Sequence, residues 1–192
     1  MRQVFLDTET TGLNPATGDR IVEIGCIEMV NRKLTGRTLH CYLNPERDMP
    51  AEAEKIHGLS SEFLSDKPLF AHVADEVVAM LQGAEVIIHN ADFDVGFLDH
   101  EFKRINRGPV RELVAKVTDS LHMAREMFPG KSNTLDALCR RLDTSFRCEE
   151  HVVVADHQHD SPRFNPLDAS MVKPPQDVLG FIATDADVHG LE

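Results

Sequence analysis

The hydrophobic pattern changes its period near residue 50, and this change limits the folds that the chain can adopt. Residues 4–6 form a short apolar run, and residues 20–30 and 34–43 alternate between apolar and polar positions, which indicates three β-strands. Only residues 31–33 separate the second strand from the third. These two strands are therefore predicted to form an antiparallel hairpin beside the first.

Beyond residue 50 the apolar residues recur mainly at helical spacing, with short apolar runs between the helices. Helices are predicted over residues 51–57, 68–81, 90–104, 120–128 and 134–142, and further strands over 85–89 and 114–118. Asn133 is a candidate for the N-cap of the last helix. Three strands followed by alternating helices and strands predict an α/β domain with one mixed central sheet.

The last part of the chain differs from the rest in its proline content and hydrophobic pattern. Four of the ten prolines lie between residues 162 and 175, and helical periodicity is lost after Asp160. The sequence therefore predicts a domain over residues 1–160 and an extended or disordered tail over residues 161–192.

Composition narrows the class of protein. The chain is 42% hydrophobic and 27% charged, as in ordinary soluble globules, and it has no run of 18 apolar residues or secretory signal. We therefore expect a cytoplasmic protein that does not contact a membrane. A net charge of −12 argues against a broad basic face for nucleic acid. It leaves open a nuclease whose carboxylates are masked by metal ions.

The first candidate for chemistry is the run Asp-Thr-Glu-Thr-Thr-Gly at residues 7–12. Side chains alternate along a strand, so Asp7 and Glu9 are expected on one face. Two adjacent carboxylates repel each other and favour a counter-charge, and hard cations such as Mg²⁺ prefer such oxygens. Gly12 allows a sharp turn and close approach of a ligand. The alternative for such a pair alone is a solvated strand end.

Two further constellations contain carboxylates. Asp94 follows the strand at 85–89 by about one helical turn, and ligands tend to bind where strands of α/β sheets end. The alternative is a solvated acid at a helix N-terminus. His151 precedes Asp156 by five residues, and these two side chains are candidates for the same site. The alternative for His151 is an exposed histidine near His157 and His159.

Residues 4–142 resemble the 3′–5′ exonucleases of the DEDD superfamily, in particular the proofreading subunits of bacterial replicative polymerases. The similarity rests on residues 7–12, on residues 87–102 (IIHNADFDVGFLDHEF), on residues 116–142 and on the Ile-His-Gly-Leu run at 56–59. The spacing of His151 and Asp156 is similar to that of the histidine subclass. The resemblance implies a ribonuclease-H-like fold with a five-stranded mixed sheet flanked by helices, and an irregular C-terminal tail.

The resemblance also implies roles for individual residues. Four carboxylates would hold two Mg²⁺ or Mn²⁺ ions, and His151 would act as general base toward the attacking water. The implied metal ligands are Asp7, Glu9, Asp94 and Asp156. Residues implied to contact the 3′-terminal nucleotide are Asp7, Glu9, Thr10, Gly12, His57, Asn90 and Phe93. Implied partners are the 3′ end of DNA, the polymerase catalytic (alpha) subunit and a small theta-like subunit.

The third motif departs from the family pattern, which leaves alternatives open. Val152 follows His151 where the family usually has glycine, and Pro162 limits the helix that should hold Asp156. A polymerase-associated subunit with impaired nuclease activity is therefore an alternative to a proofreading DNA exonuclease, as is an enzyme that trims RNA 3′ ends. Residues 176–181 (Gln-Asp-Val-Leu-Gly-Phe) resemble peptides that dock on the sliding clamp.

Overall fold

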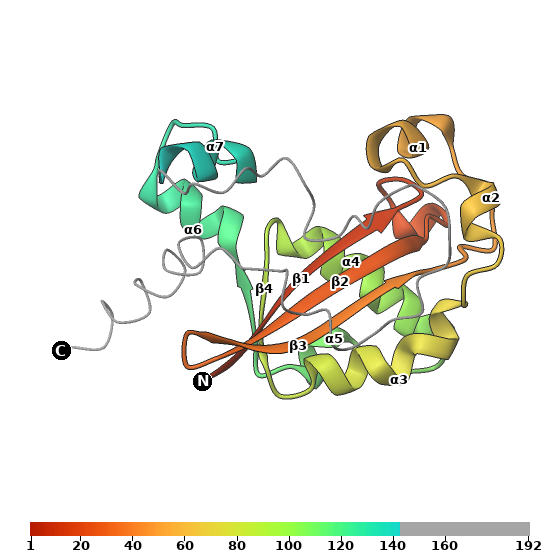
Figure 1. The fold of residues 1–192 in the computed structure, drawn as a ribbon, viewed down its shortest axis with the longest axis horizontal. Coiled ribbons are helices and arrows are strands. Elements are labelled where there is room, and N and C mark those ends of the chain that lie inside the picture. The colour runs from red at the N-terminus through yellow and green to blue at the C-terminus, as the bar shows by residue number, and fades with distance from the viewer. Residues whose placement is uncertain (143–192) are drawn as a thin grey trace.

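The computed structural model describes residues 1–142, which form one mixed sheet with helices around it (Figure 1). The five strands lie in the order β3-β2-β1-β4-β5. β1 pairs antiparallel with β2 and parallel with β4, and β4 pairs parallel with β5. The strands are β1 (Arg2–Thr10), β2 (Ile21–Val30), β3 (Lys33–Tyr42), β4 (Glu85–Ile88) and β5 (Lys116–Asp119). The predicted mixed sheet is confirmed.

The first three strands form the predicted antiparallel block. Val30 pairs with Lys33, so Asn31 and Arg32 alone make the turn, and both have positive φ. Two successive positive φ values give a turn whose twist matches that of the flanking strands. The Asn31 side chain also accepts a hydrogen bond of 2.7 Å from the N-terminal amine, which ties the start of β1 to the hairpin.

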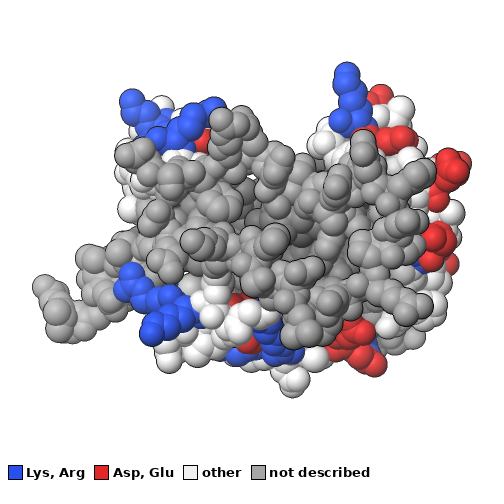
Figure 2. Space-filling view, viewed as in Figure 1, with Lys and Arg blue, Asp and Glu red and all other residues white. Residues whose placement is uncertain are grey.

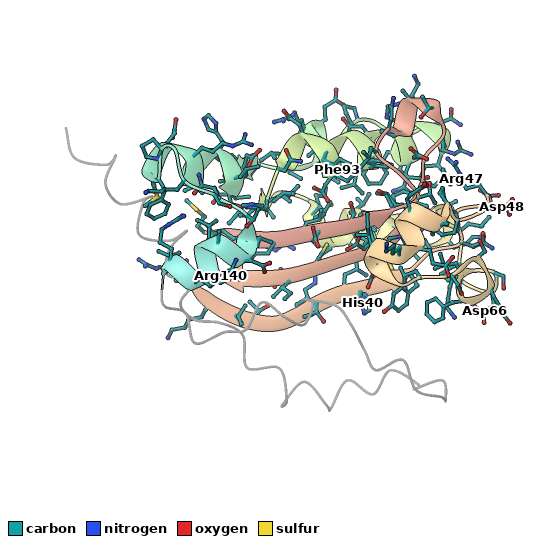
Figure 3. All side chains as sticks on the ribbon, turned by 90° about the horizontal axis from the view of Figure 1, so that it is seen from above. His40, Arg47, Asp48, Asp66, Phe93 and Arg140 are labelled. Atoms are coloured by element: carbon teal, nitrogen blue, oxygen red, sulfur yellow. The ribbon has the colours of Figure 1, made fainter. Side chains whose placement is uncertain are left out.

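Helical segments connect and flank the strands. They are η1 (Pro15–Thr17), α1 (Ala51–His57), α2 (Ser61–Leu64), α3 (Phe70–Leu81), α4 (Ala91–Arg104), α5 (Val110–Leu113), α6 (Ser120–Met127) and α7 (Leu135–Arg141). The two long helices, α3 and α4, cover the same face of the sheet (Figures 1 and 3). Within residues 1–142, no helix has the length and apolar character needed to cross a membrane.

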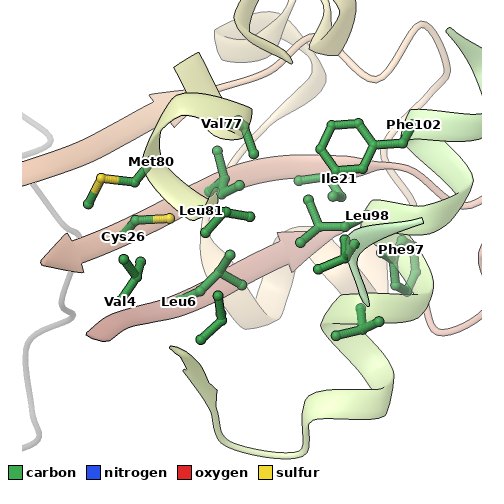
Figure 4. Close-up of a cluster of buried hydrophobic side chains, with 14 of the residues drawn as sticks. Val4, Leu6, Ile21, Cys26, Val77, Met80, Leu81, Phe97, Leu98 and Phe102 are labelled. Carbon is green, nitrogen blue, oxygen red and sulfur yellow. The ribbon is translucent and has the colours of Figure 1, made fainter. Parts of the chain in front are cut away.

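The main core lies between the sheet and these two helices (Figure 4). Val4 and Leu6 of β1 pack there with Leu81 of α3 and with Phe97 and Phe102 of α4. Burying such side chains contributes about 1.5–3 kcal/mol each. The even-numbered residues of β1 thus face α3 and α4, and alternation places Asp7 and Glu9 on the opposite face.

The structure differs from the sequence predictions in a few places. The short helices α2 and α5 were not predicted, because four residues are too few to show a hydrophobic period. Thr134 caps α7 instead of Asn133, whose side-chain amide donates to the carbonyls of Phe128 and Lys131. The predicted boundary at residue 160 and the predicted tail lie outside the described residues.

Candidate functional site

The candidate site lies where two neighbouring parallel strands end. Gln3, Val4 and Phe5 of β1 pair in parallel with residues 85–87 of β4. The carboxyl ends of β1 and β4 therefore meet at the same edge of the sheet, which is where ligands bind in open α/β sheets. β1 delivers Asp7 and Glu9 to this edge, and β4 leads through Asn90 into α4, which carries Asp94.

Asp7 and Glu9 lie within β1, which continues to Thr10, so their side chains share one face of the strand as predicted. Asp7 is exposed and Glu9 is half-buried. Burial raises the pKa of Glu9 to about 7, and the charges of Asp7, Glu23 and Asp94 add to the effect. At neutral pH this carboxylate is therefore poised between its charged and neutral forms, and a bound cation would favour the charged form.

Asp94 is the most deeply buried of the three carboxylates, with 3% of its surface exposed. Burial raises its pKa to about 7, the Thr8 hydroxyl partly offsets this, and the charge of Asp7 adds to the rise. Thr8 Oγ1 donates a hydrogen bond of 2.7 Å to Asp94 Oδ1. The charge of Asp94 thus interacts with those of Asp7 and Glu9, in agreement with the prediction that the three lie near one another. Thr8, which holds Asp94, lies on the opposite face of β1 from Asp7 and Glu9.

Sequence reasoning did not identify Thr8 as a functional residue. It lies between the two acidic positions and faces α4 together with Leu6, because side chains alternate along the strand. The available signal was a polar residue at a position of β1 that should be apolar. Its hydroxyl explains how a buried carboxylate is satisfied at this position.

The Asn90 turn is built by a carboxylate that the sequence analysis did not single out. Asp119, at the end of β5, accepts hydrogen bonds from the backbone N–H groups of Asn90 and Ala91 at 3.3 and 3.0 Å. It also accepts from Leu121 and His122 at 2.8 and 3.0 Å. One carboxylate thus caps α6 and fixes the start of α4.

Asn90 itself has a left-handed backbone, with φ of 75°, and its exposed side chain makes no capping hydrogen bond. Asparagine tolerates this conformation better than most residues. A non-glycine residue held in this region often marks a ligand-binding position. The geometry is compatible with the predicted substrate contact.

The Asp119→Ala variant is expected to lose at least about 2 kcal/mol of unfolding free energy, because it removes a helix cap and leaves four N–H donors without their acceptor. Urea denaturation measures this loss. The control is Asp92→Ala, since Asp92 is exposed on α4 and pairs only loosely with Arg111. A surface change of this kind should stay within about 0.5 kcal/mol. Equal stabilities of the two variants would contradict the capping role.

The predicted nucleotide contacts Thr10, Gly12 and His57 lie close to one another. The Thr10 hydroxyl donates a 2.6 Å hydrogen bond to the Gly12 carbonyl. A β-carbon on Gly12 would lie 2.4 Å from the Asp19 carboxylate, so a larger residue at this position would displace the Asp19 side chain. Burial lowers the pKa of His57, although Glu23 and the backbone of Thr10 favour its charged form. Its Nε2 is buried and makes no hydrogen bond within the described residues.

Phe93 contributes partly to the core. Its ring is half-buried against the main cluster and lies 4.9 Å from the ring of Phe97 between centroids. Figure 3 shows it on α4, along one face of the sheet. The structure thus gives Phe93 a packing role, and its predicted contact with nucleotide stays a prediction.

Next to Glu9 lies a second buried carboxylate, that of Glu23, which was not predicted as a site residue. Glu23 of β2 pairs directly with Glu9 across the strands, and the register shifts immediately after this pair, between Glu9 and Thr10. The Glu23 carboxylate lies 2.9 Å from His40 Nε2, and the His40 ring packs edge-on against Tyr42. Glu23 therefore adds negative charge beside Glu9, and its carboxylate also contacts His40 of β3.

The remaining predicted site residues, His151 and Asp156, and the clamp-like segment at 176–181 lie outside the described residues. Within residues 1–142, no three His, Cys, Asp or Glu side chains form a group that could hold a metal ion by themselves. The donor chemistry nevertheless fits a divalent cation. Carboxylate oxygens are hard ligands, and a cation would offset the burial and the repulsion between carboxylates that raise the pKa of Glu9 and Asp94.

Comparison with protein families and curated proteins gives consistent matches. The exonuclease family RNase_T matches residues 4–159. DNA polymerase III subunit epsilon of Rickettsia felis is 55% identical over 143 residues, covering 74% of this chain and 62% of the relative. The subunit of the same name from Escherichia coli K12 is 54% identical over 147 residues, with 74% and 60% covered. The chain thus spans about three fifths of the length of these relatives.

Solved structures with a similar fold are also exonucleases. Exonuclease X, in complex with 5′-overhanging duplex DNA, matches with a TM-score of 0.60 at 19% identity, covering 96% of this chain and 93% of that one. Escherichia coli exonuclease I, in complex with a dT13 oligonucleotide, gives a TM-score of 0.60 at 21% identity, with 69% and 31% covered. At this identity the likeness shows a common fold.

Proposed function

The chain belongs to the RNase_T family of exonucleases, and on this premise we propose that it is a metal-dependent 3′–5′ DNA exonuclease that proofreads for a replicative polymerase. One observation carries the proposal. The charge of Asp7 raises the pKa of both Glu9 and Asp94, near the carboxyl ends of β1 and β4, in a chain more than half identical to epsilon subunits of DNA polymerase III.

The proposed cofactor is a pair of Mg²⁺ or Mn²⁺ ions, and exonucleases of this family depend on divalent metal in general. Asp7, Glu9 and Asp94 would hold the ions together with Asp156. Residues 1–142 by themselves contain no complete three-ligand group, and Asp156 lies outside them. When bound, two such ions lower the pKa of the attacking water and neutralise charge on the leaving 3′ oxygen.

The protein's own residues would bind and orient the substrate and accept the proton. We assign His151 as general base, since histidine titrates near neutral pH. His57, whose buried Nε2 makes no hydrogen bond within residues 1–142, and Asn90, whose side chain is exposed, would donate to the terminal nucleotide. Thr10 and Gly12 would shape the same pocket, with Phe93 at its side.

The charge distribution supports a polyanionic substrate despite the net charge of −12. A groove of about 530 Å³ includes His89, the residue before Asn90, and is lined by the basic side chains of Arg125 and Lys131 and by one acidic side chain, Asp136. Figure 2 shows Lys and Arg side chains over the corner formed by α6 and α7, whereas Asp and Glu gather on the opposite side of this view. Positive charge next to an acidic, metal-binding site would guide the phosphate backbone toward it.

Partners and organisation are proposed from the same relatives. Because the chain is similar to proteins named DNA polymerase III subunit epsilon, we propose that it acts in the cytoplasm within a replisome, bound to the catalytic alpha subunit and a theta-like subunit. Residues 1–160 would form the nuclease domain and residues 161–192 a tail. Residues 176–181 would dock on the sliding clamp, where a tethered peptide raises the effective concentration.

The test is an end-labelled DNA duplex with a mispaired 3′ end, incubated with the purified chain and Mg²⁺ or Mn²⁺. We expect release of nucleoside 5′-monophosphates that stops in EDTA and in an Asp7→Ala, Glu9→Ala double variant, while Asp92→Ala behaves like the wild type. A matched RNA strand should be degraded more slowly. Faster RNA cleavage would indicate RNA 3′-end trimming instead. Polymerase binding without hydrolysis would indicate an interaction subunit with impaired nuclease activity.

A further inference from the structure

An ion pair between Arg20 and Glu101 is buried outside the set of carboxylates described above. The exposed fractions of the two residues are 6% and 3%. Arg20 Nε lies 2.6 Å from Glu101 Oε1, and Arg20 Nη2 lies 2.9 Å from Glu101 Oε2. Such a two-pronged contact fixes the relative orientation of the two groups as well as their distance.

The pair lies on the same side of α4 as the site. Glu101 follows Asp94 by seven residues, which is nearly two helical turns and about 10.5 Å. Asp94 is held by Thr8, and the Arg20 backbone N–H donates 3.0 Å to the hydroxyl of Thr11. Thr8 lies in β1, and Thr11 directly follows this strand. The two polar contacts of α4 are therefore both linked to the chain around the carboxyl end of β1.

The Arg20 guanidinium also reaches a third segment. Its Nη1 lies 3.2 Å from the carbonyl oxygen of Pro45 and 3.3 Å from the carboxylate of Glu46. This segment leads into α1, which ends at His57. Arg20 thus connects the chain after β1, helix α4 and the segment before α1, and these parts lie next to the proposed metal ligands and nucleotide contacts.

Stability alone does not account for an ion pair at this position. The neighbouring side chains of α4, among them Phe97, Leu98 and Phe102, are apolar (Figure 4). A buried ion pair is often no more stabilising than apolar residues of similar volume. Apolar contacts, however, are non-directional and leave a helix freer to slide or rotate on a sheet.

We infer that Arg20 and Glu101 are a positioning pair, which sets α4 on the sheet so that Asp94 stands beside Asp7 and Glu9. Neither residue touches the reacting atoms. The inference rests on the proposed function, since Asp94 must there share a metal with β1. Misplacing a catalytic group by about 1 Å costs on the order of 10²-fold in rate.

The test replaces both partners at once, as Arg20→Met with Glu101→Met, so that no charge is left buried alone. The matched control is Arg2→Met with Glu28→Met, another Arg–Glu pair at the opposite end of β1. Thermal unfolding, Mn²⁺ affinity by calorimetry in the absence of DNA, and kcat and KM on a mispaired duplex are measured for both. Arg20→Lys serves as an intermediate variant, because lysine keeps the positive charge but cannot make the two-pronged contact with Glu101.

We expect the Arg20/Glu101 double variant to unfold within a few degrees of the wild type, to bind Mn²⁺ about tenfold more weakly and to lose about 10²-fold in kcat with little change in KM. Arg20→Lys should fall between it and the wild type, and the control pair should match the wild type in kcat and Mn²⁺ affinity. Unchanged kcat and Mn²⁺ affinity would overturn the positioning role while leaving the proposed function intact. A wild-type chain that neither binds Mn²⁺ nor cleaves DNA would overturn both.

Discussion

The Asp94→Asn variant is expected to lose about 10³-fold or more in exonuclease rate and yet to unfold at a higher temperature than the wild type at pH 8 in EDTA. The rate falls because a metal-bound carboxylate supports several kcal/mol of transition-state stabilisation, and each 1.36 kcal/mol is worth tenfold. The stability rises because asparagine carries no charge into the buried position beside Thr8.

The pH dependence identifies the cause of this gain. Burial and the charge of Asp7 raise the pKa of Asp94 from 3.8 to about 7 in the folded protein. Between these values the folded state holds more protons than the unfolded state, so the stability of the wild type falls as pH rises toward 7. The advantage of Asp94→Asn should therefore be largest near pH 8 and shrink toward pH 5.

Thermal unfolding between pH 5 and 8 measures the difference, and Asp92→Asn on the exposed side of α4 is the control. The pKa of Glu9 is also raised to about 7. The unfolding temperature of Asp94→Asn should therefore still depend on pH, but less steeply than that of the wild type. Parallel pH curves for the wild type and Asp94→Asn would show that burial does not destabilise the charged form of the Asp94 carboxylate. Retained cleavage would remove it from the proposed metal site.

The single variant Arg20→Met is expected to have the largest effect on stability, a loss of about 3–5 kcal/mol in unfolding free energy. It leaves the Glu101 carboxylate buried with no other hydrogen-bond partner among residues 1–142. For a chain of this length the loss corresponds to roughly 10 °C in Tm.

The reverse single variant, Glu101→Met, should cost less. Arg20 would still have the Glu46 carboxylate and the Pro45 carbonyl within reach, whereas the Glu101 carboxylate has no such second partner. Urea denaturation of both single variants and of the double variant measures the order. We expect Arg20→Met to be least stable and the double variant to be closest to the wild type. Equal losses in the two single variants would contradict the unequal partnering.

Most of the fold follows from local patterns in the sequence. The alternation over residues 20–43 was sufficient to predict β2, β3 and their hairpin, and helical spacing was sufficient for α3 and α4. The prediction was wrong for the α7 cap, because the carbonyls of Phe128 and Lys131 engage the Asn133 amide and leave capping to Thr134. Such competition depends on how a loop folds back, which a single-sequence pattern does not encode.

By itself the sequence determined the candidate side chains for the proposed chemistry: alternation along β1 pairs Asp7 with Glu9, and a strand followed by a helix puts Asp94 near them. Only the tertiary structure decided how those charges are held. Thr8 reaches Asp94 across 86 positions of sequence, Asp119 ties the start of α4 to β5, and Arg20 reaches Glu101 across 81. Local periodicity fixes the face on which a residue lies, whereas its partner, its burial and hence its pKa depend on segments far apart in the chain.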